Sequence, residues 1–313
     1  MTLDALAVVL EQPKRIALST LAIAEPTAED VVVEVAFSGV STGTERLLWT
    51  GEMPAFPGMG YPLVPGYESI GRVVHAGASS GRSEGDWVFV PGANCYGEVR
   101  GLFGGSASRV TLPGARVTPV DENLGEKGVL LALAATAYHA MAPGHPVPDL
   151  IIGHGALGRL LARIAVAAGH PAPTVWEINP ARMDGADGYE VVRPDEDPRR
   201  DYQAIYDVSG DSSLLDTLVS RLKKGGEIVL AGFYAERLSF DFAPAFMKEA
   251  RLRTAAEFNA SDVAGVNDLL SSGALSLDGL ITHHSAPQDA GEAYQTAFSD
   301  AGCLKMILDW RPS

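Results

Sequence analysis

The chain has 313 residues, of which 46% are hydrophobic, and it carries a formal net charge of −15. That length favours two domains over one, and the negative charge makes nucleic acid and anionic membrane surfaces poor partners. No apolar run is long enough for a transmembrane segment, and the first residues lack the basic region of a signal peptide. The two cysteines, Cys95 and Cys303, fit a reduced compartment, so we expect a cytoplasmic protein.

Residues 1–122 are expected to form a β-rich domain. Short β-rich runs at 31–35, 69–74, 87–90 and 110–112 are bounded by Gly, Pro or Asp, and no long helical period interrupts them. This pattern predicts a small, irregular, barrel-like domain. Segments 50–66 and 91–106 are rich in Gly and Pro and are expected to be loops. The aromatic residues in and beside these loops either fill gaps beneath them or form a wall for a large flat ligand.

Residues 123–258 alternate between helical and strand patterns. Helices are expected at 126–142, 157–168 and 215–225, and strands at 150–152, 174–176, 189–192, 204–208, 227–231 and 252–255. This alternation predicts an α/β domain with a doubly wound, mainly parallel Rossmann sheet. Residues 193–200 are too short and too proline-broken for the usual crossover helix, which leaves the local topology open.

A glycine motif follows the first of these strands. Gly153 permits a tight turn, Gly155 lets the backbone approach a pyrophosphate, and Gly158 lets the next helix pack on the strand. The backbone N–H groups of Ala156 and Leu157, at the start of that helix, and the helix dipole favour phosphate groups. The motif therefore predicts a dinucleotide site, with a purely structural glycine turn as the alternative.

Other residues at the carboxyl ends of the strands complete the predicted coenzyme site. Glu177 ends the second strand, where an acid accepts hydrogen bonds from the adenosine ribose and repels a 2′-phosphate, which favours NAD over NADP. Arg182 lies close enough in sequence to leave NADP open. Ser209, Gly232 and Phe233 follow later strands of the same sheet. His154 lies inside the glycine motif and is expected either near the phosphates or as a residue that tolerates the turn.

Residues 259–313 form the third predicted part of the chain. Helices are expected at 262–272 and 287–299, followed by a strand at 304–310. A strand at the end of the α/β region would leave an exposed edge. We therefore expect this strand to return and pair within the first domain.

These parts together resemble the medium-chain dehydrogenase/reductase family, whose N-terminal domain is GroES-like. The markers are Ser38–Ser41, Pro65–Glu68, Gly85–Val88, Thr136–His139 and Lys305. Longer runs at 41–51, 61–69, 97–105 and 231–236 are similar to the zinc-free enzymes of this family that act in bacteriochlorophyll biosynthesis. That resemblance implies NAD-dependent oxidation of the 3-(1-hydroxyethyl) group of a (bacterio)chlorophyllide to a 3-acetyl group, and it suggests a homodimer.

The resemblance also bears on a metal. Zinc members of the family bind their catalytic ion through two cysteines and a histidine, and the matching positions here hold Ser41, Tyr67 and Ala132. Only the neighbouring Glu68 is retained. A hydroxyl, a phenol and a methyl group do not hold Zn²⁺, so we expect no metal at this site.

Without a metal, a side chain has to take the proton of the alcohol. Tyr67 is expected to hydrogen-bond the substrate oxygen, and Ser41 and Thr44 to relay the proton. Glu68, Glu45 and His139 are the candidates for the terminal base.

Each of these residues also has a structural alternative. Tyr67 is then a packed aromatic residue, His139 part of a helix, and Glu68 the ion-pair partner of a cation such as Lys305. The resemblance implies that Lys305 reaches the coenzyme pyrophosphate, with an ordinary surface lysine as the alternative.

The substrate would contact the aromatic loops. Trp49, Tyr61 and Phe103 are candidates for the macrocycle, and Arg46 and Arg100 for its propionate. Two other functions stay open at this point. One is a zinc-free, NADPH-dependent quinone or enone reductase, and the other is a non-catalytic protein that binds a dinucleotide or a pigment.

Overall fold

The computed structural model describes residues 3–54, 57–255 and 257–312, which form two compact units. Unit 1 comprises Met1–Ala132 and Leu280–Ser313, and unit 2 comprises Leu133–Gly279. The division falls inside helix α2 (Leu131–Ala140), whereas the sequence suggested a break after residue 122. Residues 259–279, which we grouped with the returning tail, lie in unit 2. No helix among the described residues is long and apolar enough to cross a membrane.

Unit 1 is built on two sheets. The first has the strand order β2-β1-β4-β7, and the second has the order β16-β17-β3-β5-β6-β9 with β8 also paired to β3. The strands are β1 (Asp4–Gln12), β2 (Arg15–Ala22), β3 (Asp30–Val40), β4 (Leu63–Val64), β5 (Ser69–Ala76), β6 (Trp87–Val90), β7 (Arg100–Gly101), β8 (Arg109–Pro113), β9 (Thr118–Pro119), β16 (His283–Ser285) and β17 (Met306–Asp309). Valine and alanine side chains from both sheets share one buried core, which agrees with the expected β-rich domain.

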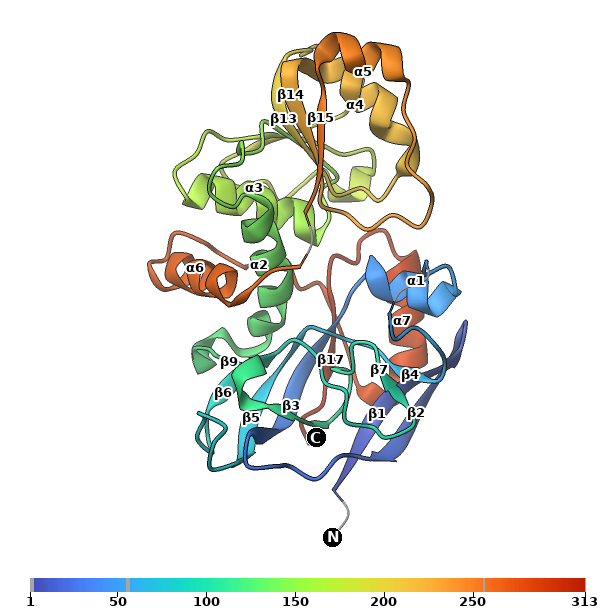
Figure 1. Ribbon diagram of the computed structural model, residues 1–313, viewed down its shortest axis with the longest axis vertical. Helices are drawn as coiled ribbons and strands as arrows, with labels where there is room; N and C mark the ends of the chain where they lie inside the picture. Colours follow the sequence, from blue (N-terminus) through green and yellow to red (C-terminus); the bar gives the residue numbers. More distant parts are fainter. Residues whose placement is uncertain (1–2, 55–56, 256, 313) are drawn as a thin grey trace. The chain divides into compact units, whose positions relative to one another are not determined.

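The tail of the chain returns to unit 1, as the sequence predicts. β17 pairs antiparallel with β3, from Met306 opposite Val40 to Asp309 opposite Phe37. Figure 1 shows this red strand beside blue β3. Helix α7 (Ala290–Ser299) buries Tyr294 in a cluster with residues of β1, β3 and β17. Residues from the two ends of the sequence therefore make one core.

Unit 2 contains one parallel sheet with the order β12-β11-β10-β13-β14-β15. This is the strand order of a Rossmann fold, so the predicted fold class is confirmed. The strands are β10 (Leu150–Ile152), β11 (Thr174–Trp176), β12 (Glu190–Val192), β13 (Tyr202–Asp207), β14 (Leu222–Leu230) and β15 (Arg251–Thr254). The helices are α2, α3 (Ala156–Ala167), α4 (Leu215–Arg221), α5 (Phe242–Lys248) and α6 (Ala260–Ser271).

Three expected helices differ from the structure at one end. The helix expected at 126–142 begins as the 3₁₀ segment η2 (Glu122–Leu130), because Gly125 has a φ of 50° that breaks an α-helix. The helix expected to close at 223–225 ends at Arg221, since Leu222 already pairs with Tyr202 and starts β14. The helix expected at 287–299 begins as the 3₁₀ turn η5 (Pro287–Asp289). The other 3₁₀ turns of the described residues have three residues each: η1 (Gly114–Arg116), η3 (Pro180–Arg182) and η4 (Ser212–Leu214).

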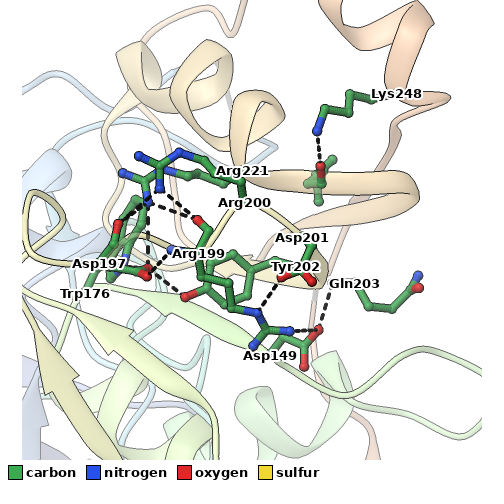
Figure 2. Close-up of polar contacts among 11 residues, drawn as sticks. Asp149, Trp176, Asp197, Arg199, Arg200, Asp201, Tyr202, Gln203, Arg221 and Lys248 are labelled. Carbon is green, nitrogen blue, oxygen red and sulfur yellow. Dashed lines mark hydrogen bonds and ion pairs between the residues drawn. The ribbon is translucent and has the colours of Figure 1, made fainter.

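A buried polar cluster replaces the crossover helix that residues 193–201 lack. The Asp197 carboxylate accepts hydrogen bonds from Trp176 Nε1 at 2.7 Å and from the Tyr202 hydroxyl at 2.6 Å. Arg221 stacks on Trp176 and donates to the Asp197 carbonyl, while Arg199 stacks on Tyr202 (Figure 2). The connection thus covers the sheet through charged side chains, and the local topology that the sequence left open is the ordinary one.

We predict that Asp197→Asn destabilises the protein by about 2–4 kcal/mol. Trp176 and Tyr202 both donate to Oδ2 of Asp197, and the Arg199 N–H donates to Oδ1, so the NH₂ group of Asn meets a donor whichever way the amide turns. The substitution also removes the negative charge beside Arg221. Urea unfolding of the two proteins measures the difference. The exposed Asp195, which pairs with Arg193, provides the matched control Asp195→Asn. Equal midpoints for wild type and Asp197→Asn would contradict the role given to the cluster.

Candidate active site

Two hydroxyl groups meet where the sequence placed the catalytic residues. Ser41 follows the end of β3, Tyr67 lies in the turn after β4, and their side-chain oxygens are 2.6 Å apart. The Tyr67 ring packs edge-on against Phe103, with ring centres 5.4 Å apart. Burial, followed by the charge of Glu68, raises the pKa of Tyr67 well above its ordinary value, and Thr44 also hydrogen-bonds its hydroxyl. Tyr67 is therefore a neutral phenol at neutral pH.

Glu45 lies buried behind this hydroxyl pair. It stands in the first turn of α1 (Thr44–Thr50), where its carboxylate accepts the Ser41 N–H at 3.0 Å and the Tyr294 hydroxyl at 2.7 Å. Tyr294 Oη also lies 3.3 Å from the Ser106 hydroxyl. Burial is the main cause that raises the pKa of Glu45 from 4.5 to about 7. Of the groups around Tyr67, Glu45 is thus suited to exchange a proton near neutral pH.

Glu68 and Lys305 form a fully buried ion pair. Their side chains are 0% and 1% exposed, so the hypothesis of a surface lysine is wrong and the pairing suggested as an alternative is present. A Cβ at Gly39 would lie 2.5 Å from Glu68 Oε2, so a larger residue there would displace the carboxylate from its present position. Glu68 Oε1 has no hydrogen-bond partner among the described residues. The pair therefore buries a carboxylate together with its counter-charge in unit 1.

The predicted macrocycle residues gather around one apolar cluster of unit 1. Trp49, Tyr61 and Phe103 are half-buried against Leu48, Leu63 and other residues of that cluster. Trp49 packs on Phe298 with ring centres 5.6 Å apart. Arg46 and Arg100 are exposed, and the Arg100 guanidinium lies beside Gly60.

In unit 2, the glycine motif has the geometry that close approach requires. Gly153 has a φ of 101°, and a Cβ at Gly158 would lie only 1.9 Å from the Gly153 carbonyl oxygen. Gly155 is the N-cap of α3, and no side chain caps that helix. The first N–H groups of α3, from Ala156 and Leu157, are thus presented without a capping oxygen, which suits a diphosphate.

Residues at the ends of the parallel strands surround this turn. A Cβ at Gly153 would contact Ser209, and a Cβ at Gly232 would contact Val208. Ser209 donates its hydroxyl to Asp207, and Phe233 is 41% exposed. The sequence analysis did not identify Asp207, whose pKa is raised by burial, although it lies within a predicted strand and ends β13.

Glu177 is held by three backbone amides. Its Oε1 accepts from Ile178 and Asn179, both at 2.8 Å, and its Oε2 accepts from His154 at 2.9 Å. A carboxylate has about four acceptor positions, so one position on Oε2 stays available. Ile178, which the sequence analysis also passed over, is 69% exposed. An exposed apolar side chain beside an acid at a strand end suggests contact with a ligand, and this exposure is known only from the structure. These residues fit a dinucleotide.

His139 lies in unit 2, whereas the Ser41–Tyr67 pair lies in unit 1. Its Nδ1 lies 2.9 Å from Asp262 Oδ2, and Asp262 is part of the capping box at the start of α6. His139 therefore joins α2 to α6, which agrees with the structural alternative.

The residues at the positions matching the family's zinc ligands, Ser41, Tyr67 and Ala132, do not form a metal-binding group. Ser41 and Tyr67 bond each other, and Ala132 is fully buried. Among the residues that the structure describes, no group of three or more His, Cys, Asp or Glu side chains is placed to hold a metal ion. The metal-free site stays a prediction, based on the chemistry of these side chains.

Comparison with known proteins agrees with this architecture. Residues 27–122 match the model of the alcohol dehydrogenase GroES-like domain. The 2-desacetyl-2-hydroxyethyl bacteriochlorophyllide A dehydrogenase of Rhodobacter capsulatus is 58% identical over 306 residues, which cover 97% of this chain and 98% of that protein. The protein of that name from Cereibacter sphaeroides is 57% identical, with coverage of 97% and 98%.

Solved structures share the fold at low sequence identity. A short chain alcohol dehydrogenase from Escherichia coli, complexed with the cofactor NADH, superposes with a TM-score of 0.82 at 22% identity. The match covers 98% of this chain and 99% of that one.

The buried Glu45 carboxyl generates a prediction about stability. Because its pKa is raised to about 7, the folded chain binds more protons than the unfolded chain between pH 4.5 and 7, and its stability falls as pH rises through that range. Glu45→Gln mimics the protonated form, since its oxygen accepts from Ser41 and its NH₂ donates to Tyr294. The variant should lack this fall, a difference on the order of 3 kcal/mol.

Urea unfolding at pH 5 and pH 8 measures this effect. Glu52, just after α1, is exposed and provides the control Glu52→Gln, which should keep the pH dependence of the wild type. If Glu45→Gln and the wild type changed by the same amount between the two pH values, Glu45 would not be the titrating group.

Proposed function

The chain belongs to the medium-chain dehydrogenase/reductase family, and from that premise we propose that it oxidises the hydroxyethyl side chain of a bacteriochlorophyllide to an acetyl group. The observation that carries this proposal is the 58% identity, over nearly the full length of both chains, to a dehydrogenase named for that substrate. Neither the quinone reductase nor the non-catalytic alternative has an observation of this kind in its favour.

The reaction removes a hydride from the carbinol carbon and a proton from its oxygen. When bound, a nicotinamide coenzyme supplies the hydride acceptor. Gly153, Gly155 and Gly158 would hold its diphosphate through the backbone amides at the start of α3, since no side chain occupies that position. Ser209, Gly232 and Phe233 border the same edge of the sheet.

We propose NAD as the coenzyme. The fixed carboxylate of Glu177 keeps one acceptor position, which suits a ribose hydroxyl, and its charge repels a 2′-phosphate. The resemblance also assigns Lys305 to the pyrophosphate. In unit 1 its ammonium group pairs with Glu68.

The proton leaves through the hydroxyl cluster of unit 1. The neutral phenol of Tyr67 hydrogen-bonds the substrate oxygen, with Ser41 and Thr44 as relay groups. Glu45 is the better terminal base than Glu68, because its pKa is about 7 whereas the Glu68 carboxylate is paired with an ammonium group. His139 has no part in this proposal, since its ring bonds Asp262 at the start of α6.

The half-buried rings of Trp49, Tyr61 and Phe103 offer apolar area for the flat macrocycle. Arg46 and Arg100 are the exposed cations that would receive its propionate. We also propose that the protein is a homodimer and is located in the cytoplasm.

Turnover tests this function directly. The protein is mixed with NAD or NADP and a 3-(1-hydroxyethyl) bacteriochlorophyllide, and the absorbance of the reduced coenzyme is recorded with the red band of the pigment. We expect both signals to change together with NAD. Tyr67→Phe should lower kcat by about 10²–10⁴-fold and leave NADH affinity unchanged, because only the hydroxyl at the substrate is lost.

The matched control removes another buried phenol of unit 1. The Tyr96 hydroxyl donates to the Gly104 carbonyl, so Tyr96→Phe loses a hydrogen bond without touching Ser41. The control should keep wild-type kcat. Absence of turnover with both coenzymes would refute the function, and full activity of Tyr67→Phe would remove that residue from the mechanism.

A further inference from the structure

His154 has an unusual place for a titratable residue. It stands between the first two glycines of the motif, and its side chain is 0% exposed. Its ring lies against Tyr189, with ring centres 5.6 Å apart and an angle of 81°. Because the side chain is sealed from solvent, it does not reach a ligand, and its contacts within the protein define its role.

The hydrogen bonds of His154 fix its tautomer. Nδ1 lies 2.6 Å from the Arg182 carbonyl oxygen, which only accepts, so Nδ1 carries the proton. Nε2 is then the acceptor, and it receives the Tyr189 hydroxyl at 2.8 Å. Burial lowers the pKa of His154 to about 4, so this neutral form persists at neutral pH. One imidazole thus bonds two points of the segment that follows Glu177.

Arg159, one turn into α3, forms a second set of hydrogen bonds to the same segment. Its side chain donates to the carbonyl groups of His154 at 3.1 Å, Arg182 at 3.2 Å and Asp184 at 2.6 Å. A Cβ at Gly185 would lie 2.1 Å from the Arg159 guanidinium, so the backbone closes tightly over that group. The carbonyl of Arg182 accepts from both His154 and Arg159, which fixes its position twice.

The segment held in this way is 178–189, between β11 and β12. It contains only the 3₁₀ turn η3, so it has no apolar helix face to pack on the sheet. Its first two residues, Ile178 and Asn179, donate their N–H groups to Glu177. The Arg182 guanidinium lies 3.7 Å from the Cβ position of Gly155, beside the turn where a diphosphate would approach. The position of the segment therefore determines where the Glu177 carboxylate and the Arg182 guanidinium lie beside the glycine turn.

We propose that His154, Arg159 and Tyr189 are positioning residues that fasten segment 178–189 to the glycine turn, so that Glu177 and Arg182 are preorganised for the adenosine diphosphate half of the coenzyme. This inference rests on the proposed binding of a nicotinamide dinucleotide. The three residues act through others, so their loss weakens coenzyme binding and leaves the chemistry in unit 1 unchanged.

Tyr189→Phe is the direct test, because it removes only the hydroxyl that His154 accepts. Binding of ADP-ribose and of NADH to the full chain is measured by calorimetry, and kcat is measured at saturating NAD. We expect the Kd of both ligands to rise about tenfold, with kcat within about twofold of wild type. A weakening shared by ADP-ribose locates the effect in the adenosine half.

Tyr206→Phe is the matched control. The Tyr206 hydroxyl donates to the Pro146 carbonyl at 2.6 Å, so this variant also loses a buried hydrogen bond of unit 2, away from the glycine turn. It should bind both ligands as the wild type does. If Tyr206→Phe and Tyr189→Phe weakened binding equally, the effect would be a general loosening and the inference would be overturned.

A second variant covers the case in which Tyr189→Phe does not fold. Arg159→Lys keeps the positive charge but has no planar fork to reach three carbonyls, and we expect the same loss of ADP-ribose affinity together with faster amide hydrogen exchange over 178–189. Wild-type affinity in either folded variant overturns the inference alone. A wild-type chain that binds neither ligand overturns the proposed function together with it.

Discussion

The close contact between Gly158 and Gly153 is the constraint on which the rest of the coenzyme site depends. Since a Cβ at residue 158 would lie 1.9 Å from the Gly153 oxygen, only glycine lets α3 start so near the end of β10. The helix then directs its uncapped N-terminus at the carboxyl edge of the parallel sheet. Ser209, Gly232 and Glu177 reach the same edge because their strands are parallel to β10. One steric contact thereby fixes where the N–H groups at the start of α3 lie.

Unit 1 applies a different constraint, which is the burial of charge. The Glu68–Lys305 pair and the Glu45 carboxyl lie among hydroxyl groups in a region closed to solvent. Burying charged groups is costly unless they are paired, and β17 brings Lys305 to Glu68 across more than 200 positions of sequence. The tail therefore supplies a buried ion-pair partner to unit 1 as well as part of its core. Tyr294 on α7 reaches Glu45 in the same way.

The two units show what a sequence can and cannot predict. Strands, the glycine motif and the returning tail follow from local patterns, because periodicity and glycine chemistry act over a few residues. The partners of Glu45 do not, since Tyr294 lies in an ordinary helical pattern and its role depends on tertiary pairing. The function of His154 was open for the same reason, because Tyr189 and Arg182 approach it only after the chain has turned. The short helix α5 was not predicted from the sequence.

The central claim is that the glycine turn of unit 2 holds the diphosphate of a nicotinamide coenzyme. Calorimetric titration of NADH into the full chain and into Gly158→Ala tests it most directly. The account predicts one molecule bound per wild-type chain, and a large loss of affinity in the variant, because its methyl group displaces the start of α3. A wild-type chain that binds neither NADH nor NADPH at millimolar concentration, or a variant that binds NADH as tightly as wild type, would contradict it.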